Sequence, residues 1–369
     1  MRYRMGVLLL IAAIGLTAIP SVTACGGFFC QNVPVDQQAE RIIFTVNDND
    51  TITAYVQINY VGSAPDFSWV VPVPSVPEVD VAEIATFDEL SSLTAPVFIP
   101  PDMPDCAQVV MFAASVPESA SADDTGVVVL ASGTAGPYQY DVITSPEPNE
   151  LITWLRTNNY QITEQMEPLV KVYTDEGMVF LAMKLQPDQG VADIQPVVMT
   201  YESTEPMIPL RLTAVAAVPN MNVITWIFAD EQAYPTNYAH PEIEEENLRF
   251  FPFSGNNYLQ LVDMTVDLYN GRAFITEYAQ STGDFARQTP PADPLLRELL
   301  KKYDYVTRFF VRISPEEMII DPMFEFDSRL PDVPNTRDVS YLDPEVAWGC
   351  KDVPINVEYD MDAQPEDLP

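Results

Sequence analysis

The sequence predicts an α+β fold, in which a β-rich N-terminal hairpin region precedes a mixed αβ region and disulfides join the parts. Residues 51–60 alternate strictly between apolar and polar side chains, as in a strand with one buried face. Beyond residue 126, β-type runs alternate with helical patterns. We predict a signal peptide at 1–24, a β-rich region at 25–99, a Pro/Ala/Ser/Asp-rich linker or loop at 100–126, a mixed αβ region at 127–330 and an acidic extended tail at 331–369.

The first 24 residues have the parts of a secretory signal peptide. Arg2 and Arg4 precede an apolar run at 6–19, and Val22-Thr23-Ala24 forms a small-residue cleavage site. The apolar run is shorter than the roughly 20 residues that span a bilayer. A proline or a charge interrupts every later apolar run. The sequence therefore predicts an exported protein, extracellular or in the cell envelope, without a membrane-spanning segment.

Cys25 stands directly after the cleavage site and has two alternative roles. Val22-Thr23-Ala24-Cys25 resembles a bacterial lipobox, whose cysteine is lipidated and would anchor the protein. After ordinary cleavage, Cys25 would instead keep its thiol for a disulfide. The short spacing of Cys25 and Cys30 favours a bond between them, which leaves Cys106 to pair with Cys350. Four cysteines allow three pairings, so the connectivity stays open.

The charge balance argues against nucleic acid and anionic lipid as partners. The chain has 18 basic and 54 acidic residues, and loss of Arg2 and Arg4 with the signal leaves 16 basic residues and a net charge of −38. Nucleic acids and anionic lipids bind clustered Lys and Arg. The acidic residues are scattered, which favours a solvated surface over a dedicated site, with cationic partners or divalent cations as alternatives. An unknown protein or small molecule stays open as the partner.

The N-terminal region begins with a predicted β-hairpin. Residues 41–46 and 51–60 are the two strands, and the Asn- and Asp-rich sequence between them is typical of a turn. Residues 67–73 continue the alternation as a third strand. Pro72 and Pro74 confine this strand to a sheet edge or an extended segment, because proline cannot donate to a strand ladder.

Helices and strands farther along follow from caps and periodicity. A capping box at 86–89 predicts a short helix that buries Phe87, Leu90 and Leu93. Further helices are expected at 148–158, at 257–270 and from Asp293-Pro294 onward. Strands are expected at 127–130, 138–144, 178–185, 197–201, 210–218, 223–229, 273–278 and 305–313.

Several motifs occur in an order that resembles one bacterial family. They are Cys25-Gly26-Gly27-Phe28-Phe29-Cys30, Ala39-Glu40-Arg41-Ile42-Ile43-Phe44, Asp66-Phe67-Ser68-Trp69-Val70-Val71-Pro72-Val73-Pro74, Gly271-Arg272-Ala273-Phe274-Ile275-Thr276-Glu277-Tyr278, Thr307-Arg308, Ser314-Pro315-Glu316-Glu317-Met318 and Asp321-Pro322. Together they resemble the exported bacterial proteins grouped as domain of unknown function 2330. The resemblance implies export, and it brings no activity, cofactor or catalytic residue to this chain.

Two features could indicate catalysis, and each has a simpler explanation. Asp124-Thr125-Gly126 is the tripeptide of pepsin-like aspartic proteases, but the second copy that would supply the partner carboxylate is missing. His240 is the only histidine and could act as a general base or metal ligand. No nucleophile motif accompanies it, which favours a structural or surface role. The glutamates at 242–246 are expected on the exposed face of a helix that begins at Pro241.

Arg308 and Arg312 are the candidate anion-binding residues. Both fall on the same face of the strand predicted at 305–313, and paired guanidinium groups suit a carboxylate or phosphate. Salt bridges to the abundant acids of the chain are the favoured alternative. Ser314 begins a capping box with Pro315, so it is expected to cap a helix rather than act as a nucleophile.

No cofactor is evident and no metal ligand is assigned. Asp48, Asn49 and Asp50 could supply oxygen atoms to Ca²⁺, but the spacing and the distal glutamate of an EF-hand loop are missing. A hairpin turn explains these residues more simply.

The function stays unknown at this point, with two hypotheses from different classes. The first is an exported cell-envelope or secreted protein with a non-enzymatic binding or structural role. The second is an extracytoplasmic hydrolase whose carboxylate pair is brought together only in the fold. Two carboxylates in one cleft would favour the hydrolase, whereas acids spread over a convex surface would favour the binding protein.

Overall fold

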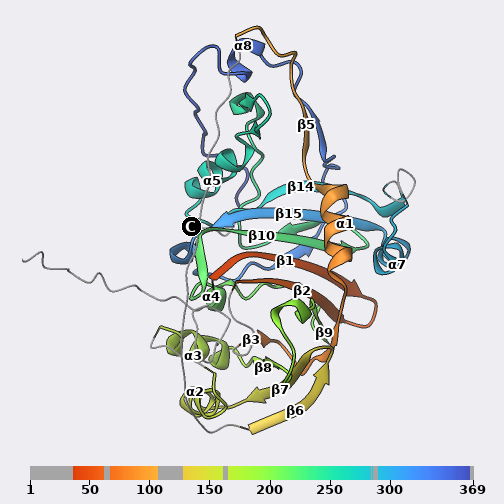
Figure 1. Ribbon diagram of the computed structural model, residues 1–369, viewed down its shortest axis with the longest axis vertical. Helices are drawn as coiled ribbons and strands as arrows, with labels where there is room; N and C mark the ends of the chain where they lie inside the picture. Colours follow the sequence, from red (N-terminus) through yellow and green to blue (C-terminus); the bar gives the residue numbers. More distant parts are fainter. Residues whose placement is uncertain are drawn as a thin grey trace, which may run out of the picture.

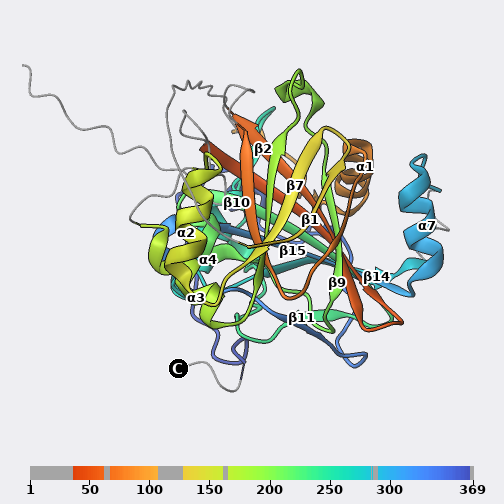
Figure 2. The same ribbon diagram turned by 90° about the horizontal axis from the view of Figure 1, so that it is seen from below.

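The computed structural model describes residues 36–61, 67–106, 128–160, 165–283, 285 and 290–365. Two β-sheets packed face to face form the centre, and helices cover their outer faces (Figures 1 and 2). A further group of elements around α5 and α8 extends from one end (Figure 1). The predicted α+β fold class is confirmed.

The larger sheet has, among the described residues, seven strands in the order β14-β15-β10-β1-β2-β9-β4. The predicted hairpin is present as β1 and β2. β1 pairs in parallel with β10, and the other neighbours are antiparallel, so strands from both predicted regions share this sheet. The bounds are β1 (Asp36–Asn47), β2 (Thr51–Val61), β4 (Glu78–Val81), β9 (Val197–Glu202), β10 (Ala217–Ala229), β14 (Ile275–Ser281) and β15 (Tyr305–Ile313).

The smaller sheet is antiparallel, with strand order β3-β8-β7-β6. Its two edge strands are β3 and β6, and the position of β3 is the one that Pro72 and Pro74 predicted. Phe44 and Val56 of the larger sheet pack with Trp69 and Leu181 of the smaller one in the core between them. The bounds are β3 (Ser68–Val73), β6 (Val128–Ala135), β7 (Tyr138–Thr144) and β8 (Val179–Leu185). Helices α2 (Pro148–Thr157), α3 (Glu167–Asp175) and α4 (Leu210–Thr213) belong to its outer layer.

The outer face of the larger sheet is covered by α1 (Ile84–Thr94) and α7 (Pro294–Lys302). Phe87 and Leu90 of α1 are fully buried there, as predicted. The capping box predicted at 86–89 is wrong, because α1 begins at Ile84 and Thr86 lies inside its first turn. Thr86 instead donates from Oγ1 to Asp293 Oδ1 at 3.0 Å, which links the two helices.

The group at the end of the molecule has its own small core of Leu248, Phe250, Leu261, Val339 and Ala347. β5 and β17 pair in parallel within it. A disulfide joins Cys106 to Cys350, with their Cα atoms 5.9 Å apart, and this is the pairing that the sequence favoured. The bounds are β5 (Val97–Ile99), β12 (Phe250–Phe251), β13 (Gly255–Asn256), α5 (Tyr258–Leu268), β17 (Thr336–Asp338) and α8 (Pro344–Ala347).

Short elements complete the described chain and correct two predictions. Residues 210–213 form helix α4 rather than the start of a strand, because Asp321 Oδ1 accepts the Arg211 backbone N–H at 2.9 Å and holds a helical turn there. The helix predicted from Pro241 is reduced to the turn η3. The short elements are β11 (Ala233–Pro235), β16 (Phe324–Phe326), η2 (Val191–Asp193), η3 (Glu245–Asn247) and η4 (Pro315–Glu317), and the cap predicted at Ser314 opens the last of these.

The predicted signal peptide, Cys25, Cys30, the tripeptide at 124–126 and most of the predicted linker lie outside the described residues. In the part of the chain that is described, no helix has both the length and the apolar character needed to cross a membrane.

We predict that replacing both Cys106 and Cys350 by serine lowers the free energy of unfolding by about 2–5 kcal/mol. The bond spans 244 residues of sequence, so its loss frees a large loop in the unfolded chain. Denaturant unfolding under non-reducing conditions measures the change. An unfolding midpoint equal to that of the wild type would contradict the stabilising role of this disulfide.

Candidate functional site

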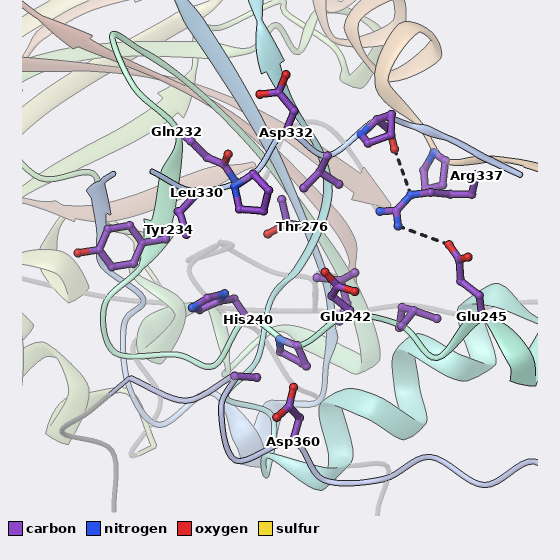
Figure 3. Close-up of a pocket in the computed structure, with 18 of the residues that line it drawn as sticks. Gln232, Tyr234, His240, Glu242, Glu245, Thr276, Leu330, Asp332, Arg337 and Asp360 are labelled. Carbon is purple, nitrogen blue, oxygen red and sulfur yellow. Dashed lines mark hydrogen bonds and ion pairs between the residues drawn. The ribbon is translucent and has the colours of Figure 1, made fainter. Parts of the chain in front are cut away.

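The candidate site is a cavity of about 460 Å³ on the side of the molecule where β14 ends the larger sheet. Its walls come from β5 and the residue before it, β11, the segment at 240–245, the start of α5, strand β14, the segment at 330–337 and the tail at 360–363. These segments converge on one space although they lie far apart in the sequence (Figure 3).

Backbone hydrogen bonds bring these segments together along β14. Ala279 and Val333 exchange two bonds of 2.8 Å, which fixes one wall. The backbone N–H of Phe274 donates to the Ala239 carbonyl at 2.9 Å, and the backbone N–H of His240 donates to the Ala363 carbonyl at 3.0 Å. The tail is thus connected through the segment around His240 to the strand, and its acidic residues reach the cavity.

The rim of the cavity is acidic. Five carboxylates line it in the described part of the chain, those of Glu242, Glu245, Asp332, Asp360 and Asp362. All but Glu245 belong to residues that are exposed to solvent. Figure 3 shows Asp332 and Asp360 on opposite sides of the cavity. Carboxylates placed around one space attract positive charge.

Arg337 is the one Lys or Arg side chain among the described residues that line the cavity. Its Nη1 lies 3.5 Å from Glu245 Oε1, and its Nε donates to the Pro334 carbonyl at 3.0 Å (Figure 3). The guanidinium therefore neutralises part of the negative charge on one side of the cavity. Among the described residues that line the cavity, no Lys or Arg side chain pairs with the carboxylates of Asp332 and Asp360.

His240 lines the same cavity and adds little positive charge at neutral pH. Burial lowers the pKa of its imidazole below the usual 6.5, and the neighbouring Asp360 carboxylate opposes this shift only in part. The histidine was expected to have a structural or surface role. The structure places it in the cavity wall beside Asp360, and no group of three or more His, Cys, Asp or Glu side chains in the described part of the chain could hold a metal ion there.

The inner wall of the cavity is aromatic and aliphatic. The rings of Phe98 and Tyr258 lie 5.2 Å apart at 48°, and both line the cavity. Ile243 and Ile275 add aliphatic surface. A ligand of this cavity would therefore place an apolar body against these side chains and a polar group at the rim.

Tyr258 connects the cavity wall to a buried ion pair. Its hydroxyl donates to Glu277 Oε1 at 2.8 Å, and Arg308 Nε donates to Glu277 Oε2 at 2.6 Å. The side chains of Glu277 and Arg308 are only 2% and 5% exposed. Burial raises the pKa of the Glu277 carboxyl although Arg308 opposes the shift, and burial also raises the pKa of Tyr258.

Arg308 is held from three further directions. Its Nη1 donates to the Ser91 carbonyl and to Thr94 Oγ1, both at 3.2 Å, and its guanidinium lies 5.3 Å from the Trp226 ring centre. The ion pair therefore fixes the position of Tyr258 in the cavity wall.

The structure does not bring the predicted anion-binding pair together around a common space. Arg308 is buried behind the cavity, and Arg312 Nη1 pairs with Asp263 Oδ2 at 2.5 Å while its Nε donates to Asn222 at 3.2 Å. Both guanidinium groups make the salt bridges that were the favoured alternative. Anion binding at either residue stays a prediction, and it would require displacing a carboxylate of the chain.

The candidate Ca²⁺ ligands form the turn between β1 and β2. Asn49 Oδ1 accepts a hydrogen bond from Thr51 Oγ1 at 2.9 Å, and Asp50 has a positive φ of 55°. Within the described residues, no group of three or more His, Cys, Asp or Glu side chains could hold a metal ion. The turn explains this sequence without a bound cation.

The sequence analysis did not identify most of the cavity residues. Asp332, Arg337 and Asp360 come from the region predicted as a tail or near its start, where no spacing rule points to a site. The available signals were His240, because it is the only histidine, and the family motif at 271–278, because its Ile275 and Thr276 line the cavity and its Glu277 holds Tyr258.

Comparison with known proteins supports that resemblance. One family model, described as an uncharacterized protein conserved in bacteria (DUF2330), matches residues 19–325. The match includes His240 and the Glu277–Arg308 pair but ends before Asp332, Arg337 and the tail. No curated protein and no solved structure matches the chain.

We predict that Arg308→Leu lowers the free energy of unfolding by about 3–5 kcal/mol, because Glu277 would stay buried without its partner. The double variant Arg308→Leu with Glu277→Leu should recover much of that loss. Denaturant unfolding measures both. Lys171→Ala, at an exposed ion pair, is the control and should stay close to the wild type. A wild-type value for Arg308→Leu alone would contradict the structural role of the pair.

We predict that the pKa of His240 in the folded protein lies below 6.5. At pH values between the pKa of the folded protein and 6.5, the unfolded chain binds more protons at this histidine than the folded protein does. The contribution of His240 to the free energy of unfolding is therefore fully present above pH 6.5 and declines as the pH falls through this window. Because the chain has one histidine, its NMR titration is unambiguous. His240→Gln should flatten the pH dependence of stability in that window, and an NMR pKa above 6.5 would refute the assignment.

Proposed function

We propose a non-enzymatic binding function for this chain, which belongs to the DUF2330 family of uncharacterized proteins conserved in bacteria. The protein would act after export, in the cell envelope or outside the cell, and hold its ligand in the cavity beside β14. The observation that carries the proposal is the cavity itself, because about 460 Å³ falls within the range of roughly 300–1,000 Å³ found for small-molecule sites.

The charges of the cavity suggest the chemical class of ligand. Its rim has five carboxylates against one guanidinium, and the imidazole of His240 is neutral at neutral pH. Its inner wall includes the rings of Phe98 and Tyr258. This combination favours an organic cation with an apolar body, because carboxylates bind the positive group and aromatic rings accept the body and attract a nearby cation.

Export supports a binding function of this kind and rests on two observations. The sequence begins with the parts of a signal peptide, and the folded chain contains the Cys106–Cys350 disulfide. Disulfides persist mainly in oxidising compartments outside the cytoplasm. Lipidation of Cys25 would tether the same cavity to a membrane surface, and free secretion would leave it in solution.

A carboxylate-based hydrolase is the second candidate, because several carboxylates surround one cavity. Glycosidases need one carboxyl group that stays protonated, and burial commonly provides this. The buried carboxyl group that comes nearest to meeting this requirement is that of Glu277. It is bound to Arg308 and is not part of the cavity lining. The carboxylates of Glu242, Asp332, Asp360 and Asp362 are solvent-exposed, which favours binding over general acid catalysis.

We predict that 4-phenylbutylamine binds the purified protein and that 4-phenylbutyrate, which has the same apolar body and the opposite charge, does not. Isothermal titration calorimetry measures both, and the affinity for the amine should fall with added salt. The double variant Asp332→Asn with Asp360→Asn should weaken amine binding roughly tenfold or more, because it removes two carboxylates from the rim.

The control variant is Asp175→Asn with Asp188→Asn, which removes the same charge outside the cavity and should leave binding unchanged. Equal binding of amine and carboxylate, or equal weakening by both double variants, would contradict the proposed site. Hydrolysis of a panel of aryl glycosides, abolished by Asp332→Asn with Asp360→Asn, would instead establish the hydrolase.

A further inference from the structure

The hairpin formed by β12 and β13 exposes one phenylalanine almost completely. Phe253 is 97% exposed, the highest value among the large apolar residues described. It sits in a four-residue turn in which Ser254 donates from its N–H to the Phe251 carbonyl at 3.1 Å. Pro252 precedes it, and Phe253 itself has a φ of +67°. Proline at the second position and a positive φ at the third identify a type II turn.

Phenylalanine is poorly suited to this position. The third residue of a type II turn is normally glycine or asparagine, because a side chain with a Cβ is disfavoured at positive φ. The other non-glycine residues with positive φ in the described chain are all Asn or Asp, namely Asp50, Asn159, Asp188, Asn220 and Asn270. Phe253 combines an unfavourable backbone conformation with an apolar ring that is 97% exposed, so the ring packs on little of the described chain.

The hairpin is anchored by a buried residue at its base, and the sequence around the exposed ring has no acidic residue and one basic residue, Arg249. Phe250 is buried at its base, with its ring centre 5.7 Å from that of Trp348. Phe251, the first residue of the turn, is 46% exposed. The stretch at 247–262 contains no Asp or Glu in a chain that has 54 acidic residues. These features define an apolar knob, made of Phe251 and Phe253 at the tip of the hairpin, on an otherwise acidic protein.

We propose that this knob docks into an apolar cleft of a protein partner whose surrounding surface is basic. A backbone that is fixed in an unfavourable conformation presents the ring in one position. Such preorganisation favours binding to a cleft of defined shape, and it gives no advantage for insertion into a fluid bilayer. The net charge of the chain selects a basic surface around that cleft and disfavours anionic membranes. Aromatic residues, phenylalanine included, are enriched in the cores of protein–protein interfaces.

The experiment uses the full-length protein in the bacterium that produces it, with the photo-crosslinking residue benzoylphenylalanine in place of Phe253. Cross-linked proteins are identified by mass spectrometry, purified, and tested for binding to the wild type, to Phe253→Gly and to the control Ile319→Ala. Ile319 is 61% exposed and lies outside the hairpin. Phe253→Asn is a second variant, because Asn also tolerates a positive φ.

Three results together support the proposal. The first is that the identified protein is basic. The second is that its Kd rises at least roughly tenfold for Phe253→Gly and for Phe253→Asn and stays unchanged for Ile319→Ala. The third is that both Phe253 variants unfold at the wild-type temperature or above. An adduct with lipid alone, an adduct with a second copy of this chain alone, or no adduct overturns it. A marked fall in unfolding temperature for both variants also overturns it, because Phe253 would then serve the fold.

Discussion

The buried ion pair between Arg308 and Glu277 is the interaction on which the centre of the molecule depends. Two charged side chains that are 5% and 2% exposed are tolerated only when each finds further hydrogen-bonding partners. Those partners come from different layers, with Ser91 and Thr94 on α1 and Tyr258 at the start of α5. The requirement to satisfy one charge pair therefore sets the relative position of a helix layer, the larger sheet and the cavity wall.

A second polar network links the smaller sheet's helix layer to the chain beyond β15. Asp321, which is largely buried, accepts hydrogen bonds from the Arg211 backbone and side chain and from the Tyr173 hydroxyl at 2.7–3.0 Å. Arg211 also forms a bidentate pair with Glu176 at 2.8 and 2.9 Å. Both networks use residues of the family motifs: Arg308 and Glu277 belong to the first network, and Asp321 belongs to the second. These parts of the resemblance are therefore explained by the requirements of the fold rather than by chemistry.

Sequence patterns predicted the elements whose register is set locally. The hairpin of β1 and β2 follows from the alternation at 51–60, and β7 and β15 follow from runs of β-type residues. The expectation that the hairpin buries one face only is wrong, because α1 and α7 cover the outer face of the larger sheet and bury Thr53 and Gln57 on the polar side of β2. The prediction failed at 210–218 and after Pro241, where contacts from distant segments decide the backbone. Asp321 holds a helical turn at Arg211, and the tail bonds to Glu244 and Asn247 through Glu358 and Asn356.

The sequence by itself determined the α+β class, the principal strands, the charge balance, the export signal as an expectation and the favoured partnership of Cys106 with Cys350. These properties are local or compositional. Only the tertiary structure decided that His240, Asp332 and Asp360 share one cavity, that Arg308 is buried against Glu277 rather than offered to an anion, and that Phe253 is left exposed at a positive φ. The physical reason is that segments far apart in the sequence meet only in the fold, as β1 does with β10 and as Val333 does with Ala279 of β14.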